Sequence, residues 1–209
     1  MNSFEMDMRR AFLSKGFVSG VILQTIILFA AGTSSELFRM SVPILCTLPY
    51  ATAWLTDYKN GFLRVYLART DKENYIGGKI LSCAISGGSV TALSGQIYVL
   101  FGPEKQMEDI QVLLFFVSGM FWAVFSATLA AWSKNYYIAY GGGFVIYYLL
   151  VILHERYFEE LYCLNPIEWL IPEHIWVFGE TGIVLLVGGI TLIFVWGYAF
   201  ILWRCMECF

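Results

Sequence analysis

Six apolar runs follow one another along the chain, and short polar stretches separate them. A helix needs about 20 residues with few or no charges to cross roughly 30 Å of hydrocarbon. The pattern therefore predicts an all-α membrane protein with six transmembrane helices in a single domain, residues 1–209. The expected spans are residues 17–33, 40–56, 80–102, 110–132, 136–153 and 182–203.

Composition agrees with this class. Hydrophobic residues make up 58% of the chain, charged residues make up 14%, and the mean hydropathy is +0.66. A soluble core of this size could not hide so much apolar surface. A charged, patterned segment precedes the first run, and no small-residue cleavage site follows it. We therefore interpret that run as a permanent span rather than a signal peptide.

Lysine and arginine are concentrated on one side of the predicted spans, as is typical of cytoplasmic loops. With the N-terminus inside, the inner side holds ten of them: Arg9, Arg10, Lys15, Lys59, Arg64, Arg69, Lys72, Lys79, Lys134 and Arg204. The outer side holds three: Arg39, Lys105 and Arg156. We therefore expect a cell-membrane protein with both termini in the cytoplasm.

Residues 1–16 carry helix signals of their own. Ser3 is a suitable N-cap, and Gly16 stands where a helix-terminating glycine would. Between them, apolar residues from Phe4 to Phe12 recur with helical spacing. This pattern predicts an amphipathic interfacial helix along the cytoplasmic leaflet. A frayed basic tail is the alternative.

Residues 57–79 form a charged island between the second and third spans. Tyr58 and Phe62 lie on an apolar face of the predicted helix, opposite Lys59. A capping box at residues 70–73 then begins a second helix, which leads into the third span. The first helix suits docking in a groove of another protein. An interfacial helix that touches only lipid headgroups is the other interpretation.

Several residues at the end of the second span and in the island form a loose motif. They are Leu48-Pro49-Tyr50, Asp57-Tyr58-Lys59-Asn60-Gly61-Phe62, Arg69, Tyr75-Ile76 and Lys79. Together with the order of the elements along nearly the whole chain, this motif resembles small permease subunits of ABC-2 type exporters. The architecture is more specific than any single match.

The resemblance implies a coupling helix that sits on a separate ATP-binding subunit. It places this role on residues 57–69, called the coupling segment below. The residues implied are Asp57, Tyr58, Lys59, Phe62, Arg64, Tyr66 and Arg69. The resemblance also implies a second permease subunit, identical or different, and a bacterial, Gram-positive source.

In the same family the segment before the sixth span forms helices that dip back into the outer leaflet. The resemblance places this re-entrant element on residues 154–181, where Asn165, Pro166 and Trp169 suit it. The segment is also acidic, so an exposed extracellular loop is the alternative for part of it.

The sequence holds no chemistry for hydrolysing ATP. Gly77-Gly78-Lys79 is followed by Ile80 and lacks the first glycine of a phosphate-binding loop. We therefore expect no enzymatic activity and no directly bound cofactor, with ATP and Mg²⁺ held by the partner ATPase. The span centres carry no acidic, basic or histidine side chains, and Gln24 and Gln96 are their most polar residues. This disfavours an ion-coupled carrier.

Other candidate chemistry is weak. His154-Glu155-Arg156 lacks the second histidine of a metalloprotease motif, so we expect no metal site. Cys205 and Cys208 form an isolated pair near the C-terminus, more typical of free or lipidated cysteines than of a zinc or redox site. Membrane lipid is an expected partner, and nucleic acid is not.

Glycines indicate close helix packing. Gly16 and Gly20 form a GxxxG pair at the start of the first span, and Gly141 lies at the start of the fifth. In lipid such positions let helices approach closely. They suit either a dimer contact or packing within one subunit.

The expected function is that of a permease subunit in an ATP-binding cassette exporter. Its cargo would be hydrophobic or amphipathic, such as an antimicrobial peptide or a lipid-like compound. Aromatic residues in the fourth span, among them Phe115, Phe121 and Trp122, suit such cargo but also suit ordinary packing. Two alternatives remain: the substrate-binding subunit of a vitamin importer, and a non-transporting immunity or scaffold protein.

Overall fold

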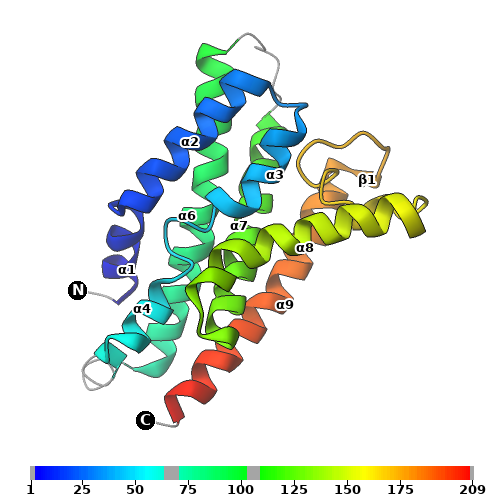
Figure 1. Ribbon diagram of the computed structural model, residues 1–209. Helices are drawn as coiled ribbons and strands as arrows, with labels where there is room; N and C mark the ends of the chain where they lie inside the picture. The colour runs from blue at the N-terminus through cyan, green and yellow to red at the C-terminus, as the bar shows by residue number, and fades with distance from the viewer. Residues whose placement is uncertain (1–2, 64–70, 103–108, 208–209) are drawn as a thin grey trace.

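The computed structural model describes residues 3–63, 71–102 and 109–207 and is almost entirely helical (Figure 1). The elements are α1 (Ser3–Phe12), α2 (Lys15–Ala31), α3 (Glu36–Leu45), α4 (Ala53–Lys59), α6 (Lys72–Phe101), α7 (Asp109–Ser133), α8 (Tyr136–Tyr157), the 3₁₀ helix η1 (Tyr162–Leu164), β1 (Val177–Gly179) and α9 (Glu180–Glu207).

Within the described residues, four helices are long and apolar enough to cross a membrane: α6, α7, α8 and α9. The number rises to five if α1 and α2, which meet at a bend of 47°, count as one broken span. The structure thus confirms a predominantly helical protein with several helices long and apolar enough to span a membrane. The number of six spans stays a prediction.

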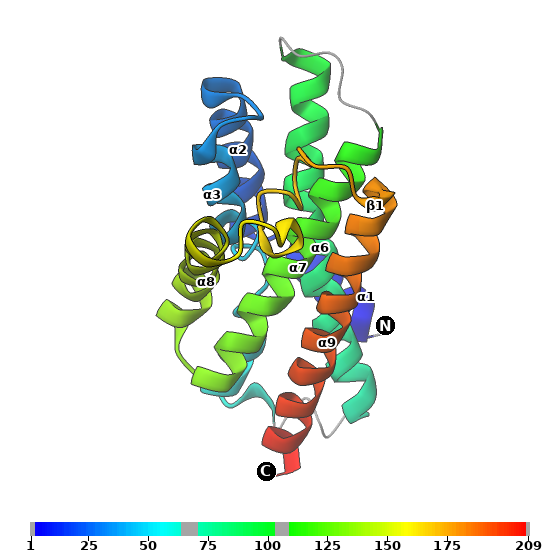
Figure 2. The same ribbon diagram turned by 90° about the vertical axis from the view of Figure 1, so that its right-hand side faces the viewer.

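The helices pack into one elongated body. α7 contacts α6, α8 and α9, and α6 also receives α1 and α2. Figures 1 and 2 show α6, α7 and α9 running along the long direction, with α8 lying across them. The end that holds α4, the start of α6, the turn between α7 and α8, and the end of α9 is called the α4 end below.

The second predicted span is not one helix. α3 ends at Leu45, turns follow, and α4 begins only at Ala53. Pro49 lies in this break, where its ring and missing N–H prevent a continuous helix. The prediction of a single helix over residues 40–56 is therefore wrong, because the proline interrupts the apolar run that suggested it.

The N-terminal helix also differs from the prediction. α1 packs on α6, and it buries Asp7 and Ala11 rather than lying apart from the bundle. Gly16 does not terminate it. α1 ends at Phe12, and the Ser14 hydroxyl then accepts a hydrogen bond from the Phe17 amide to cap α2.

The core between α6 and α7 is close-packed through small residues. A Cβ added at Gly87 would lie 2.2 Å from the Ala123 side chain, so only glycine fits there. The Thr91 hydroxyl donates to the Phe115 carbonyl at 2.7 Å, which ties the two helices together. Phe115, like Phe121 and Trp122, is buried in the main core cluster, so these aromatics pack the protein interior.

The segment between α8 and α9 folds back over this core (Figure 2). From residue 158 to 176 its only helix is η1, and turns, bends and irregular backbone make up the rest, so the helices expected in this segment are not formed there. Re-entry of the segment into the membrane stays a prediction. Asn165 caps a turn by accepting from the Ile167 amide at 3.1 Å, and Pro166 is buried. Trp169 packs against Phe121 and donates to the Cys163 carbonyl at 3.0 Å. The segment packs against this core in the half of the bundle away from α4.

Glu168 holds this segment in shape. Its buried carboxylate accepts hydrogen bonds from the backbone amides of Glu173 and His174 at 3.0 and 3.3 Å. It also contacts His174 Nδ1 at 2.8 Å. Glu173 in turn pairs with Arg39 at 3.1 Å and so fastens the segment to α3. Burial alone would raise the pKa of Glu168, but the bonds from His174 and from both backbone amides outweigh it, and the pKa is lowered.

The lowered pKa predicts how acid affects this segment. The carboxylate contributes its full stabilisation above the ordinary pKa of 4.5, and that contribution is lost as pH falls through the lower, folded value. Glu168→Gln should cost roughly 1–3 kcal/mol already at neutral pH, since it leaves a buried amide unpaired. Acrylamide quenching of tryptophan, followed from pH 7 to pH 3, should show earlier exposure of Trp169 in the variant. Glu159→Gln, at an exposed position, should match the unaltered protein; identical acid profiles for all three proteins would contradict the assignment.

Candidate functional site

The ammonium group of Lys79 lies at the centre of a buried cluster near the α4 end. Its Nζ is 2.7 Å from Asp57 Oδ2 and 3.0 Å from Asp7 Oδ1. It also donates to the Tyr50 hydroxyl at 2.9 Å. The Lys79 side chain is only 1% exposed. The three donors of a lysine ammonium thus all have partners.

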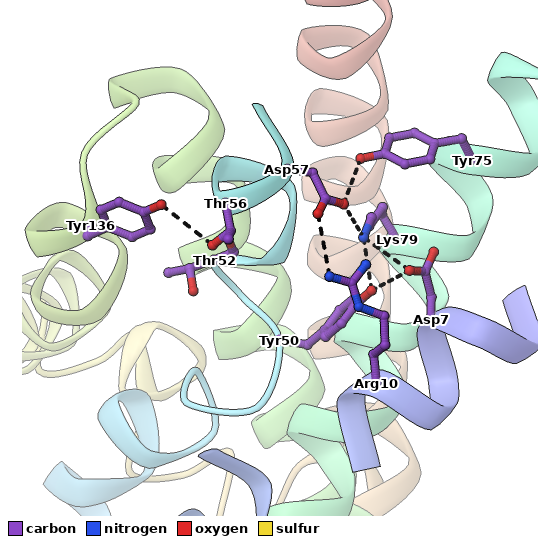
Figure 3. Close-up of polar contacts among 9 residues, drawn as sticks. All are labelled: Asp7, Arg10, Tyr50, Thr52, Thr56, Asp57, Tyr75, Lys79 and Tyr136. Carbon is purple, nitrogen blue, oxygen red and sulfur yellow. Dashed lines mark hydrogen bonds and ion pairs between the residues drawn. The ribbon is translucent and has the colours of Figure 1, made fainter. Parts of the chain in front are cut away.

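Two tyrosines and an arginine complete the cluster (Figure 3). The Tyr50 hydroxyl donates to Asp7, and the Tyr75 hydroxyl donates to Asp57 Oδ2 at 3.2 Å. Arg10 Nη2 lies 3.6 Å from Asp57 Oδ1 at the solvent edge. These six residues are called the ionic network: Asp7, Arg10, Tyr50, Asp57, Tyr75 and Lys79.

The ionic network is balanced in charge, with two carboxylates against two cations. Removing such charges from water costs several kcal/mol per ion, and only good geometry with further hydrogen bonds repays it. The two tyrosine rings help as well, because Nζ of Lys79 lies 5.0 Å from the Tyr50 ring centre and 5.4 Å from that of Tyr75. Asp7 Oδ2 is buried without a hydrogen-bond partner among the described residues, but the balance of charge suits a fixed mechanical joint between elements.

Three parts of the fold bring the ionic network together. Gly78 lets α1 approach α6, since a Cβ there would lie 3.1 Å from Asp7 Oδ2 and 3.5 Å from the Phe4 backbone. The break after α3 places Tyr50 in a turn that reaches the same point. α4, which follows the break, contributes Asp57 to the ionic network. Residues distant in sequence therefore meet because the second span is broken.

The other side of α4 is held by the turn between α7 and α8. Tyr58 stacks on Trp54 with ring centres 5.1 Å apart, and its hydroxyl accepts from Lys134 Nζ at 3.0 Å. Lys59 Nζ lies 4.3 Å from the ring centre of Tyr136. Closer to the start of the helix, the hydroxyls of Thr52 and Tyr140 are 3.0 Å apart. α4 is thus fixed both to α6 and to the start of α8.

The predicted coupling residues divide into three groups. Asp57 points inward to the ionic network, and Tyr58 packs against Trp54. Lys59 and Phe62 are exposed at the α4 end, Phe62 by 59%. Arg64, Tyr66 and Arg69 lie outside the described residues. α6 begins at Lys72, within one residue of the predicted start, but the Asp71 side chain before it makes no capping hydrogen bond, and Thr70 of the predicted capping box lies outside the described residues.

The three glycines singled out by sequence have different surroundings. A Cβ on Gly16 would lie 2.2 Å from the Leu48 carbonyl oxygen, and one on Gly20 would lie 3.2 Å from that of Leu45. Both therefore pack helices within this chain. No atom of the described chain, apart from local helix backbone, lies within 4 Å of a Cβ on Gly141, which is exposed on α8.

Sequence reasoning missed Asp7 and the pairing of Lys79. Lys79 was counted as a cytoplasmic surface cation, whereas the structure buries it. One signal was present: Tyr50, Asp57, Tyr75 and Lys79 all belong to the motif that carried the family resemblance. Asp7 carried no signal, because a single acidic residue in the first turns of a helix is ordinary.

The described part of the chain holds no group of three His, Cys, Asp or Glu residues arranged for a metal ion. Cys205 is a half-buried free thiol, and Cys208 lies outside the described residues. In the ionic network the Lys79 ammonium and the hydroxyls of Tyr50 and Tyr75 all contact the carboxylates of Asp7 or Asp57, an arrangement that suits a structural joint. In comparisons with known proteins, no protein family, no curated protein and no solved structure matches this chain.

Proposed function

We propose that this chain is the membrane-spanning permease subunit of an ATP-binding cassette exporter that moves hydrophobic or amphipathic cargo. α4 and the rest of the coupling segment would dock on the ATPase, and the α4 end would face the cytoplasm. The observation that carries the proposal is the attachment of α4 to two membrane helices. α4 is joined to α6 by the Lys79–Asp57 ion pair, to the turn after α7 by the hydrogen bond from Lys134 to Tyr58, and to the start of α8 by Lys59, which lies over the Tyr136 ring.

A docked motor needs such attachments. An ATPase that closes on binding ATP pulls on the short helix in its groove, and the pull becomes useful only if that helix is rigidly fixed to the spans. The 2.7 Å Lys79–Asp57 ion pair and the 3.0 Å hydrogen bond from Lys134 to the Tyr58 hydroxyl give α4 two separate fixed points. Exposed Phe62, just beyond α4, offers an apolar group for a partner's groove.

A second permease subunit would cover the outward face of α8. Tyr137, Gly141, Val145 and Tyr148 recur there with helical spacing and are all exposed. Gly141 would let a neighbouring helix approach closely. This face suits the dimer in which two such subunits shift against each other, while the glycines of α2 hold each subunit together.

Photo-crosslinking in the source cells tests the docking helix. A benzophenone amino acid at Phe62 should capture a protein whose sequence contains the phosphate-binding loop GxxxxGK[ST], identified by mass spectrometry. The same probe at Ile175, which is 97% exposed near the opposite end, should not capture it. If Phe62 yields only lipid adducts, the coupling segment is an interfacial helix and the proposal fails.

A matched pair of variants extends this test. Phe62→Asp should abolish co-purification of the captured ATPase and leave the thermal stability of the permease unchanged, because the side chain it replaces is exposed. Ile175→Asp should keep the ATPase bound. An ATPase that remains bound to Phe62→Asp, with its hydrolysis still stimulated by the permease, would contradict docking at this site.

A further inference from the structure

A small cavity lies between the start of α9 and the segment that precedes it, in the half of the bundle away from α4 (Figure 1). Its volume is about 290 Å³. Pockets for drug-sized ligands span roughly 300–1,000 Å³. This cavity therefore suits a small ligand, or the head of a larger one.

Three aromatic side chains line the cavity: Tyr162, Trp176 and Phe178. Tyr162 and Trp176 meet edge to face with ring centres 5.1 Å apart. The Trp176 indole also donates to the buried Glu168 carboxylate at 3.5 Å, which helps to fix the ring in place. The face of an aromatic ring carries the negative part of its quadrupole, so a wall of such rings favours a cation over a neutral molecule of the same shape.

The charge in the wall has the sign that a cation needs. Glu160 is the only charged residue among the described residues that line the cavity. It is exposed, and it forms no ion pair within the described part of the chain. Leu161 and Leu186 form apolar parts of the wall, so a metal ion would lack the several oxygen ligands that it requires. The lining therefore selects an organic cation.

We propose that this cavity binds a quaternary ammonium group, with its methyl groups against the aromatic rings and its charge balanced by Glu160. Aromatic side chains recognise such groups through the attraction between the cation and the ring faces. The group occurs both in free ions such as choline and in cationic amphiphiles such as dodecyltrimethylammonium. The site is separate from the coupling segment and does not depend on the exporter role proposed above.

Equilibrium binding of radiolabelled choline to the purified full chain, in an uncharged detergent, tests the proposal. Binding should be saturable, and tetramethylammonium should displace the label. Dimethylbutanol, in which a carbon atom replaces the charged nitrogen of choline, should compete roughly tenfold more weakly, because it lacks the charge that the rings and the carboxylate recognise.

Two variants of the lining have matched controls. Glu160→Gln and Phe178→Leu should each weaken choline binding by roughly tenfold, since one removes the charge and the other an aromatic ring. Glu159→Gln and Phe158→Leu change exposed neighbours that do not line the cavity and should bind choline as the unaltered protein does. All four positions are exposed, so the variants should share one melting temperature.

Maleimide labelling of Cys163 locates the ligand, because this free thiol lines the cavity whereas Cys46 and Cys83 are buried. In a chain with Cys205→Ala and Cys208→Ala, choline should slow the labelling several-fold. Protection by dodecyltrimethylammonium at far lower concentration would assign the site to the head of an amphiphile, and equal protection would assign it to the free ion.

Three results would overturn the site. They are the absence of saturable choline binding, equal competition by choline and dimethylbutanol, and an equal loss of binding in the control variants. Labelling of Cys163 that neither ammonium compound slows would place any bound cation elsewhere and would also overturn it.

Discussion

Lys79→Met should lower the free energy of unfolding by about 3–5 kcal/mol, the largest effect expected of any single change in this chain. The variant keeps the volume of the side chain but leaves Asp7 and Asp57 buried without their shared cation. The two buried carboxylates then share only Arg10, which lies at the solvent edge 3.6 Å from Asp57. Tyr50 would keep Asp7 as a partner but lose the donor that Lys79 supplied.

Thermal unfolding in detergent, followed by size-exclusion chromatography with fluorescence detection, measures this effect. The midpoint should fall by roughly 10 °C. Lys72 lies in the same helix at an exposed position, so the control variant Lys72→Met should leave the unfolding midpoint nearly unchanged. Adding Asp7→Asn and Asp57→Asn to Lys79→Met removes the buried charge and should recover most of the loss. If Lys79→Met and the unaltered protein unfold at the same temperature, the ionic network does not stabilise the fold.

The second large effect concerns the contact between α6 and α7. Gly87→Val should destabilise the protein by about 3 kcal/mol or more, because its side chain would overlap Ala123. The carbonyl oxygens of Cys46 and Gly119 lie 3.0 and 3.2 Å from the same added Cβ. These are backbone atoms, so the overlap is relieved only by moving α7 and the turn after α3 away from α6.

Gly77→Val is the matched control for this change. Gly77 lies in α6 too, but no described atom outside the local helix is within 4 Å of its added Cβ. The same detergent melting experiment should therefore separate the two variants clearly. Equal stability of Gly87→Val and Gly77→Val would mean that α6 and α7 do not pack through glycine as the structure shows.

The long helices could be predicted from sequence, because each is a continuous apolar run between polar residues. Residues 110–132, 136–153 and 182–203 correspond to α7, α8 and α9, with ends that differ by up to four residues. The break at Pro49 was harder to foresee. A proline in an apolar run can kink a membrane helix or end it, and only the neighbouring contacts decide which. Here Gly16 admits the Leu48 carbonyl, which holds the turn in place.

Only part of the candidate site could be predicted from the sequence, because its buried part also depends on contacts between distant residues. The exposed positions of the coupling segment, Lys59 and Phe62, followed from its amphipathic pattern. The ionic network could not be predicted in this way, because a hydropathy pattern treats charged residues near the end of a span, such as Asp7 and Lys79, as surface charges. Their burial depends on Gly78, whose lack of a side chain lets two distant helices touch. No local pattern records such a contact.

The position of Lys79 also has a consequence for synthesis. Lys79 follows both Asp7 and Asp57 along the chain, so each carboxylate is synthesised before the lysine that pairs with it. Asp7 must then wait in water or among headgroups, a place that an amphipathic helix can occupy. The first helix of the chain would therefore be among the last to take its final position. Its docking on α6 would mark the moment when the first half of the protein is assembled.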